Sequence, residues 1–132
     1  MMNFLSRSPK VTDHSSLAWH SSTAVPGVRF ATRRVSLAQR IELTQRIREL
    51  CLQHEFLKAG DAAEQVESAL GDLLIRKLYL EWGVAEIRGF RIDHRPATVE
   101  TVIQSGPETL ADEMIAVLKS EIGLTEDERK NS

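Results

Sequence analysis

The chain has 132 residues, of which 42% are hydrophobic and 27% charged, and its formal net charge is −2. This length fits one domain with a core of its own, and no run of about 18 apolar residues is present to span a membrane. The first ten residues lack the apolar stretch of a secretory signal peptide, and the single cysteine excludes an internal disulfide framework. The sequence therefore predicts a single-domain protein of the cytoplasm.

Charge is divided unevenly along the chain. Residues 1–60 carry nine Lys or Arg and four Asp or Glu, a balance of +5, whereas residues 61–132 carry eight and fifteen, a balance of −7. Such a division indicates either self-association or a charged partner. Two oppositely charged lobes that attract each other within one monomer explain it equally well.

Residues 1–24 are rich in Ser, Thr and His and have few apolar side chains. A segment of this kind buries too little surface to offset its ordering entropy, so we expect a flexible arm. Its largest apolar side chain, Trp19, is either a docking anchor for a partner or folds back onto the domain.

A strand is predicted over residues 27–35, because Val28, Phe30 and Thr32 alternate with more polar positions after the Pro26-Gly27 turn signal. A helix then begins with a capping box formed by Ser36 and Gln39. Its apolar stripe consists of Leu43, Ile47, Leu50, His54 and Leu57, and Gly60 ends it.

The second helix is predicted from a capping box at Asp61 and Glu64 to about Trp82. The two helices would form an αα-hairpin. The second helix's apolar face is predicted to contain Val66, Leu70, Leu73, Lys77 and Leu80, widened by Leu74, Leu78 and Tyr79.

The last third predicts a small β-hairpin, with strands near residues 85–92 and 95–97 and a turn at Asp93-His94. Thr98 caps a short helix over residues 99–104, and Pro107 begins a longer one that ends at Gly123. The longer helix's buried stripe is predicted to contain Leu110, Met114, Val117 and Leu118. Thr125 and Glu128 form a third capping box in the polar end of the chain.

Together these elements predict an α+β fold that is mainly α: an N-terminal strand, an αα-hairpin, a small β-hairpin and C-terminal helices. We divide the chain into a flexible arm at residues 1–24, a globular domain at residues 25–124 and a polar helical tail at residues 125–132.

The sequence contains no catalytic, cofactor-binding or metal-binding motif. The four histidines, at positions 14, 20, 54 and 94, share no metal-ligand spacing. Cys51 lies between two leucines in a predicted helix, which favours a buried structural thiol over a nucleophile. We therefore expect a protein that is not an enzyme.

Two groups of side chains are candidates for binding a partner. Leu78, Tyr79 and Trp82 crowd one end of the second helix, and they are buried either under the β-hairpin or against a partner. The basic residues Arg29, Arg33 and Arg34 are the second group, and they could contact acidic surfaces or phosphates.

The stretches "LYLEWGVAEIRGF", "IRGFRIDHRPAT" and "SGPETLADEMIAVLKSEIGLTEDERKNS" resemble the tail assembly chaperones of long-tailed phages. The resemblance covers about residues 25–132, and its motifs are structural rather than catalytic. One departure is His94, where the family usually has a Gly. The matching positions are Trp82, Gly83, Ile87, Gly89, Ile92, Asp93, Pro96, Gly123, Leu124 and Glu126 to Asn131.

The resemblance implies a protein that coats the tape measure protein, keeps it soluble and recruits tail tube subunits in the host cytoplasm. It also implies weak self-contacts and a longer product, made by ribosomal frameshifting, in which the polar tail continues. Two alternatives remain: a small nucleic-acid-binding regulator that uses the basic N-terminal half, and a structural subunit of the virion.

Overall fold

The computed structural model describes the backbone of residues 10–56 and 61–122 and the side chains of residues 10–53 and 66–122. The fold is α+β and mainly helical, as predicted. In chain order the elements are β1 (Leu17–Ser21), β2 (Arg29–Arg33), α2 (Leu37–Phe56), α3 (Asp61–Gly83), β3 (Val84–Arg88), β4 (Arg91–Ile92), β5 (Arg95–Pro96), α4 (Val99–Ser105) and α5 (Glu108–Ile122).

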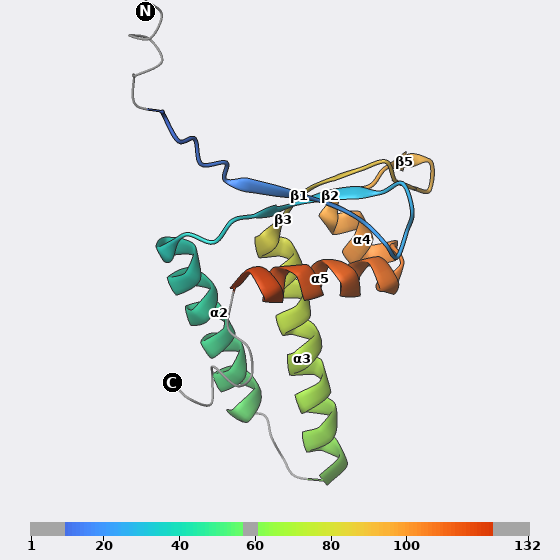
Figure 1. The fold of residues 1–132 in the computed structure, drawn as a ribbon. Helices are drawn as coiled ribbons and strands as arrows, with labels where there is room; N and C mark the ends of the chain where they lie inside the picture. Colours follow the sequence, from blue (N-terminus) through green and yellow to red (C-terminus); the bar gives the residue numbers. More distant parts are fainter. Residues whose placement is uncertain (1–9, 57–60, 123–132) are drawn as a thin grey trace, which may run out of the picture.

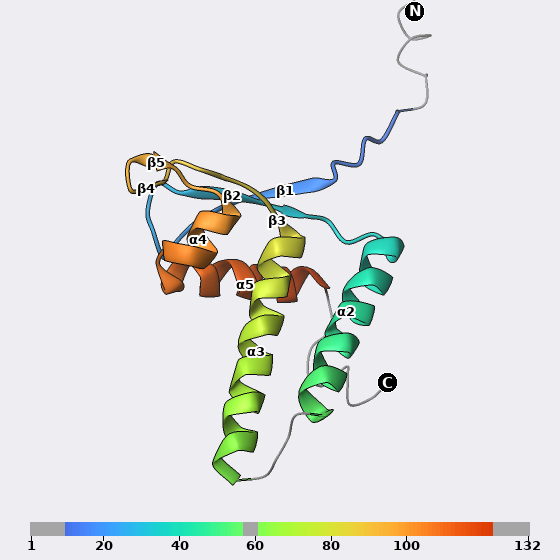
Figure 2. The ribbon, with the colours of Figure 1, turned by 180° about the vertical axis from the view of Figure 1, so that it is seen from behind.

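Strands β1, β2 and β3 form an antiparallel sheet in that order, and β4 pairs with β5 in a separate two-stranded ribbon. Helices α4 and α5 lie against one face of the three-stranded sheet (Figure 1). The view from behind agrees, and no described helix covers the other face (Figure 2). The sheet therefore has one buried face and one open face.

The core lies between the covered face of the sheet and helix α5. The predicted stripe of this helix is confirmed, because Leu110, Met114 and Leu118 are fully buried and Val117 is partly buried. From β2, Phe30 enters the same core and has no exposed surface. Burial of side chains of this size stabilises a fold by about 1.5–3 kcal/mol each.

Helices α2 and α3 lie side by side and extend away from this core (Figures 1 and 2). The predicted apolar stripe of α3 is wrong in its first half: Val66, Leu70 and Leu73 are 64%, 42% and 52% exposed. Only Leu80, at the end of the stripe, is buried. The reason is that the first half of α3 projects beyond the sheet and α5, so no described element covers that side of it.

Two of the predicted helix starts are confirmed by their hydrogen bonds. The backbone N–H of Gln39 donates to the Ser36 hydroxyl and the N–H of Ser36 donates to the Gln39 side chain, both at 3.1 Å. Thr98 forms the equivalent reciprocal pair with Thr101. Several other predictions fall outside the described residues. These are the side-chain contacts of Asp61 and Glu64, the helix ends at Gly60 and Gly123, and the tail at residues 125–132.

The prediction of a flexible arm at residues 1–24 is wrong for its last part. Residues 17–21 form strand β1, which pairs with β2 over its whole length, from Leu17 opposite Arg33 to Ser21 opposite Arg29. Trp19 consequently lies on the domain, half-buried, rather than on a free arm. Residues 1–9 lie outside the described part of the chain.

The predicted strand at residues 85–92 is two strands. Its first part, β3, pairs with β2, whereas its second part, β4, turns back onto β5. Gly89 separates them with a φ of 77°. The predicted turn is confirmed: Asp93 and His94 have φ values of 52° and 67°, the left-handed region that tight hairpin turns require.

Gly89 and Gly27 provide a matched test of this packing. Both have positive φ, but a Cβ atom at position 89 would lie 2.5 Å from the carbonyl oxygen of Gly27, whereas one at position 27 meets nothing within 4 Å. We expect Gly27→Ala to lower the free energy of unfolding by about 1 kcal/mol, the cost of positive φ alone.

Gly89→Ala should cost at least twice as much, because the backbone of the β1–β2 loop must also move. Urea denaturation followed by circular dichroism measures both values. Equal losses in the two variants would show that the close approach to Gly27 does not constrain the fold.

Candidate partner-binding surfaces

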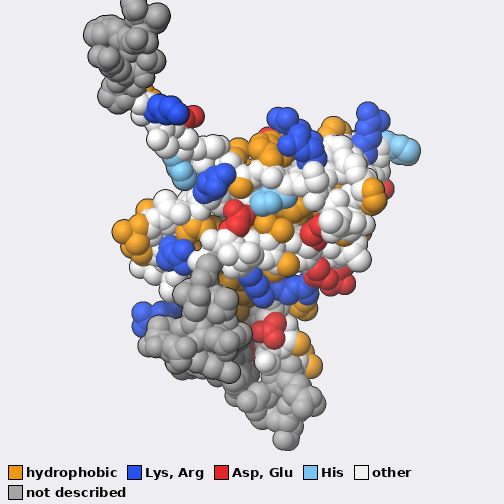
Figure 3. All heavy atoms as spheres, viewed as in Figure 1, with side chains coloured by type: hydrophobic (Ala, Val, Ile, Leu, Met, Phe, Trp, Pro, Cys, Tyr) orange, Lys and Arg blue, Asp and Glu red, His pale blue; other side chains and the backbone are white. Residues whose placement is uncertain are grey.

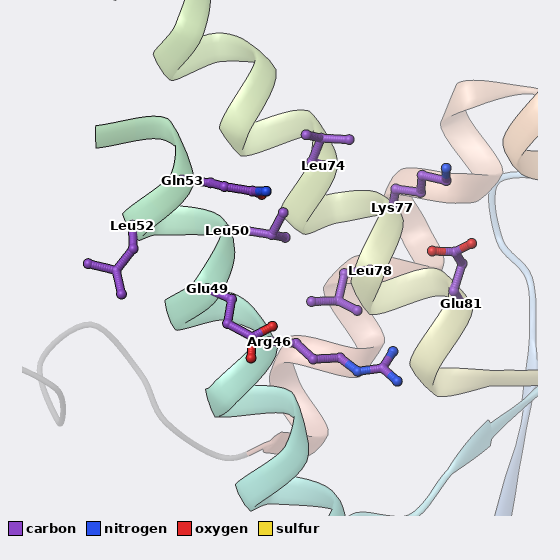
Figure 4. A pocket seen from close by; sticks show the side chains of 9 residues that line it. All are labelled: Arg46, Glu49, Leu50, Leu52, Gln53, Leu74, Lys77, Leu78 and Glu81. Carbon is purple, nitrogen blue, oxygen red and sulfur yellow. The ribbon is translucent and has the colours of Figure 1, made fainter. Parts of the chain in front are cut away.

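A groove of about 710 Å³ runs between α2 and α3 on one side of the helical hairpin. Its apolar floor consists of Leu50 from α2 and Leu74 and Leu78 from α3. Leu50 and Leu78 project from the two helices into the space between them (Figure 4). The groove is open to solvent along its length, so it offers an apolar strip rather than an enclosed cavity.

Charged side chains of both signs border this floor. Arg46 and Glu49 project from α2, and Lys77 and Glu81 project from α3 (Figure 4). Arg46 also pairs with Glu42, one turn earlier, at 2.9 Å. The border therefore carries no net charge, and it can pair with charges of either sign on a bound segment.

Apolar side chains continue beyond the groove on both helices. Large exposed apolar residues on well-folded surfaces mark interaction sites when they are grouped. The spacings of Val66, Leu70 and Leu73 place them on one face of α3. The described large apolar side chains that are exposed on the hairpin are Leu37, Ile41, Val66, Leu70 and Leu73, together with Leu52, which lines the groove itself.

A second surface lies on the open face of the sheet. Trp19 of β1 is covered by two guanidinium groups, with Arg29 at 5.1 Å and Arg88 at 4.7 Å from its ring centroid. Arg29 and Arg88 are direct partners across β2 and β3. In the space-filling view, Lys and Arg side chains lie along the upper margin over the strands, and Asp and Glu lie mostly lower (Figure 3).

The six residues predicted to bind a partner are therefore in different environments. Leu78 and Tyr79 are 8% and 5% exposed and pack in the core, although Leu78 also reaches the groove floor. Trp82 is partly buried against the same core. The crowded end of α3 is thus buried within the chain itself, and Tyr79 is not available to a partner in this conformation.

The three predicted arginines also differ in their environments. Arg33 donates through Nη1 to the carbonyl oxygens of Trp82 and Val84, at 3.4 and 3.2 Å, so it ties β2 to the end of α3. Arg29 and Arg34 are exposed. The sequence reasoning missed Arg88 and Leu50 as surface residues, because strand pairing and helix pairing bring them to their neighbours.

Helix α5 holds the sheet through two carboxylates that the sequence reasoning also missed. Glu113 accepts hydrogen bonds from the Ser22 hydroxyl at 2.5 Å and from the N–H and hydroxyl of Thr23 at 2.7 and 2.8 Å. Burial by itself raises the pKa of Glu113, but these hydrogen bonds outweigh it and leave the pKa below its ordinary value.

Glu121 forms a second attachment, together with His20 and Thr32. The Thr32 hydroxyl donates to Glu121 at 2.5 Å, and His20 Nε2 lies 3.0 Å from that hydroxyl and 3.3 Å from Glu121. A Thr, a His and a Glu in contact resemble a nucleophile with its base. Thr32 is fully buried, however, so this hydroxyl cannot meet a substrate without rearrangement, and the contacts join α5 to β1 and β2.

Three further observations concern the cysteine, metal ions and membranes. Cys51 is exposed, so its predicted burial is wrong; it lies outside the contact face of α2. Within residues 10–56 and 61–122, no group of three or more His, Cys, Asp or Glu side chains is placed to hold a metal ion. None of the described helices is long and apolar enough to cross a membrane.

Comparison with known proteins adds no relative. No protein-family model matches the chain, and neither the curated proteins nor the solved structures contain a significant match.

The Glu113 attachment predicts a dependence of stability on pH. Because the pKa of Glu113 is lower in the folded than in the unfolded chain, its contribution is present above the unfolded pKa and is lost as pH falls through the folded pKa. We expect Glu113→Gln to lower the free energy of unfolding at pH 7 by about 1 kcal/mol. The loss should shrink as pH falls below about 4, where the wild-type carboxylate is itself protonated.

Urea denaturation at pH 7 and at pH 3 measures this difference. Glu108→Gln on the same helix is the control, since Glu108 is 75% exposed and lies 3.7 Å from Arg76; it should change stability less. An equal loss at both pH values would show that the charge of Glu113 does not hold the sheet.

Proposed function

We propose that this chain is a tail assembly chaperone of a long-tailed phage or prophage. It binds the tape measure protein in the host cytoplasm, keeps that protein soluble and recruits tail tube subunits. The groove between α2 and α3 is the observation that carries the proposal, because it offers an apolar strip of helical length at the surface. The motifs of residues 82–131 support it through their resemblance to this family.

The groove suits a helical partner for a physical reason. An amphipathic helix places apolar side chains at every third or fourth position, and these would lie on Leu50, Leu74 and Leu78. Burying one leucine-sized side chain at such a site contributes about 1.5–3 kcal/mol before the costs of association. One groove would therefore bind one helical segment weakly.

Weak binding is what a coat on a long protein requires. Many copies along one tape measure protein cover it through repeated contacts, and each copy can leave when the tail is completed. The border of Arg46, Glu49, Lys77 and Glu81 has both signs of charge, which suits successive segments of different sequence. The exposed Leu70, one turn before Leu74 on α3, extends the apolar strip beyond the groove.

Co-expression with the long coiled-coil protein encoded immediately downstream tests the proposal. We expect that protein to be insoluble alone, and to become soluble and co-purify when this chain is present. If it stays insoluble and unbound, the proposed function is wrong. Absence of this chain from purified mature virions would further separate a chaperone from a structural subunit.

A pair of variants tests the groove itself. Leu74→Glu places a charge on the groove floor, whereas Leu73→Glu places the same charge one residue away, beside the hollow between α3, α4 and α5. We expect Leu74→Glu to reduce co-purification at least about tenfold, which corresponds to roughly 1.4 kcal/mol. Leu73→Glu should have a much smaller effect.

Thermal unfolding by circular dichroism shows whether each variant is folded before binding is measured. If Leu74→Glu is destabilised, the smaller change Leu74→Ala replaces it in the comparison. Equal binding by the position-73 and position-74 variants would exclude the groove as the site.

A further inference from the structure

We propose that the open face of the sheet binds single-stranded nucleic acid through Arg29 and Arg88, with Trp19 holding their guanidinium groups in place. This surface is separate from the groove, and the proposal does not depend on the chaperone function. It replaces the arginine set expected from the sequence, since Arg33 is engaged with the backbone of Trp82 and Val84.

The geometry gives two positive groups a fixed position. Arg29 and Arg88 face each other directly across β2 and β3, and both lie within 5.1 Å of the Trp19 ring centroid. Ala31, opposite Trp19 on the same face, is fully buried, so the three large side chains cover the strand. Stacking on an aromatic ring limits the motion of a guanidinium without using its N–H groups, of which the Arg88 Nε–H donates to Glu86.

The charges of this face are not balanced within the protein. Like charges directly opposite each other in a sheet are destabilising. Arg88 contacts Glu86 at 2.8 Å, but no described carboxylate contacts Arg29. The side chain of Arg88 is 62% exposed despite its ion pair. An anion that bridges Arg29 and Arg88 would remove this repulsion, so the arrangement favours a negatively charged ligand.

Further positive charge extends the surface toward the β4–β5 ribbon. Arg91 and Arg95 lie three and seven residues after Arg88, in β4 and β5, and both are exposed. Neither contacts a carboxylate among the described residues. In Figure 3, Lys and Arg side chains lie at separate places along this margin, with uncharged and hydrophobic surface between them. A long polyanion would reach more than one of these places, which a single ion could not.

Nucleic acid fits this surface better than an acidic peptide does. A single strand carries one phosphate per nucleotide, and arginine binds phosphate with two parallel hydrogen bonds. Its bases also stack on guanidinium planes, and Arg29 and Arg88 present such planes over Trp19. An acidic peptide would use only the charges of the two guanidinium groups.

Fluorescence anisotropy with a dye-labelled oligothymidylate of about 20 nucleotides tests the proposal on the full chain. The test variant is Arg29→Gln with Arg88→Gln. The control is Arg40→Gln with Arg48→Gln, which removes the same charge from α2 at positions that do not line the groove. Circular dichroism confirms that both variants are folded, and each titration is repeated at several salt concentrations.

We expect the wild type to bind with an affinity that falls as salt rises. The Arg29 and Arg88 variant should bind at least about tenfold more weakly, and its salt slope should be smaller by about 1.4, the value for two lost phosphate contacts on a single strand. The control should retain most of the affinity and nearly the full slope.

Three results would overturn the proposal. The first is no binding by the wild type at low salt. The second is an equal loss in both double variants, which would indicate attraction by net charge alone. The third is binding of a polyglutamate peptide, but not of the oligonucleotide, in a way that depends on Arg29 and Arg88; the surface would then take acidic protein segments.

Discussion

The packing of α5 against the covered face of the sheet is the constraint on which the rest of the structure depends. Met114, Leu110 and Leu118 fill the space beneath Phe30, and none of the four is more than 1% exposed. The same packing determines how α3 ends. A Cβ atom at Gly83 would lie 2.3 Å from a terminal carbon of Leu118, so a larger residue there would require the Leu118 side chain to shift. The Trp82-Gly83 pair thus has a packing reason at the point where α3 becomes β3.

Polar contacts attach β1 to the domain, because apolar packing alone does not hold this strand. Strand β1 offers little apolar surface to the core, and the carboxylates of Glu113 and Glu121 hold it from below. Glu113 binds the turn after β1, and Glu121 reaches His20 within it. Because hydrogen bonds to a charged group are stronger than neutral ones, two carboxylates can order a strand that its composition alone would leave free.

Much of the fold could be predicted because the signals are local. The capping boxes at Ser36 and Thr98, the alternation around Phe30 and the turn at Asp93-His94 all act within a few residues. Strand β1 could not be predicted from its own polar residues. A carboxylate that orders it, that of Glu121, contacts His20 from 101 positions later in the chain. The burial pattern of α3 failed for a related reason: its period shows which residues share a face, but not how far the neighbouring elements extend along the helix.

The candidate surfaces likewise depend partly on local sequence signals and partly on contacts with distant elements. The spacing of positions 29, 31 and 33 alone predicts that they share the open face of β2. Arg33, however, donates hydrogen bonds to backbone carbonyls, whereas Arg29 stacks on the Trp19 ring. The path of the neighbouring elements determines these different contacts. Pairing with β3 places Arg88 beside Arg29, and the end of α3 lies beside Arg33.

The groove lies between α2 and α3, whereas the open sheet face is the one turned away from α4 and α5 (Figure 1). A helix bound along α2 and α3 would leave Trp19, Arg29 and Arg88 uncovered. The two surfaces have no residue in common, so a ligand on one of them does not occupy the place of a ligand on the other.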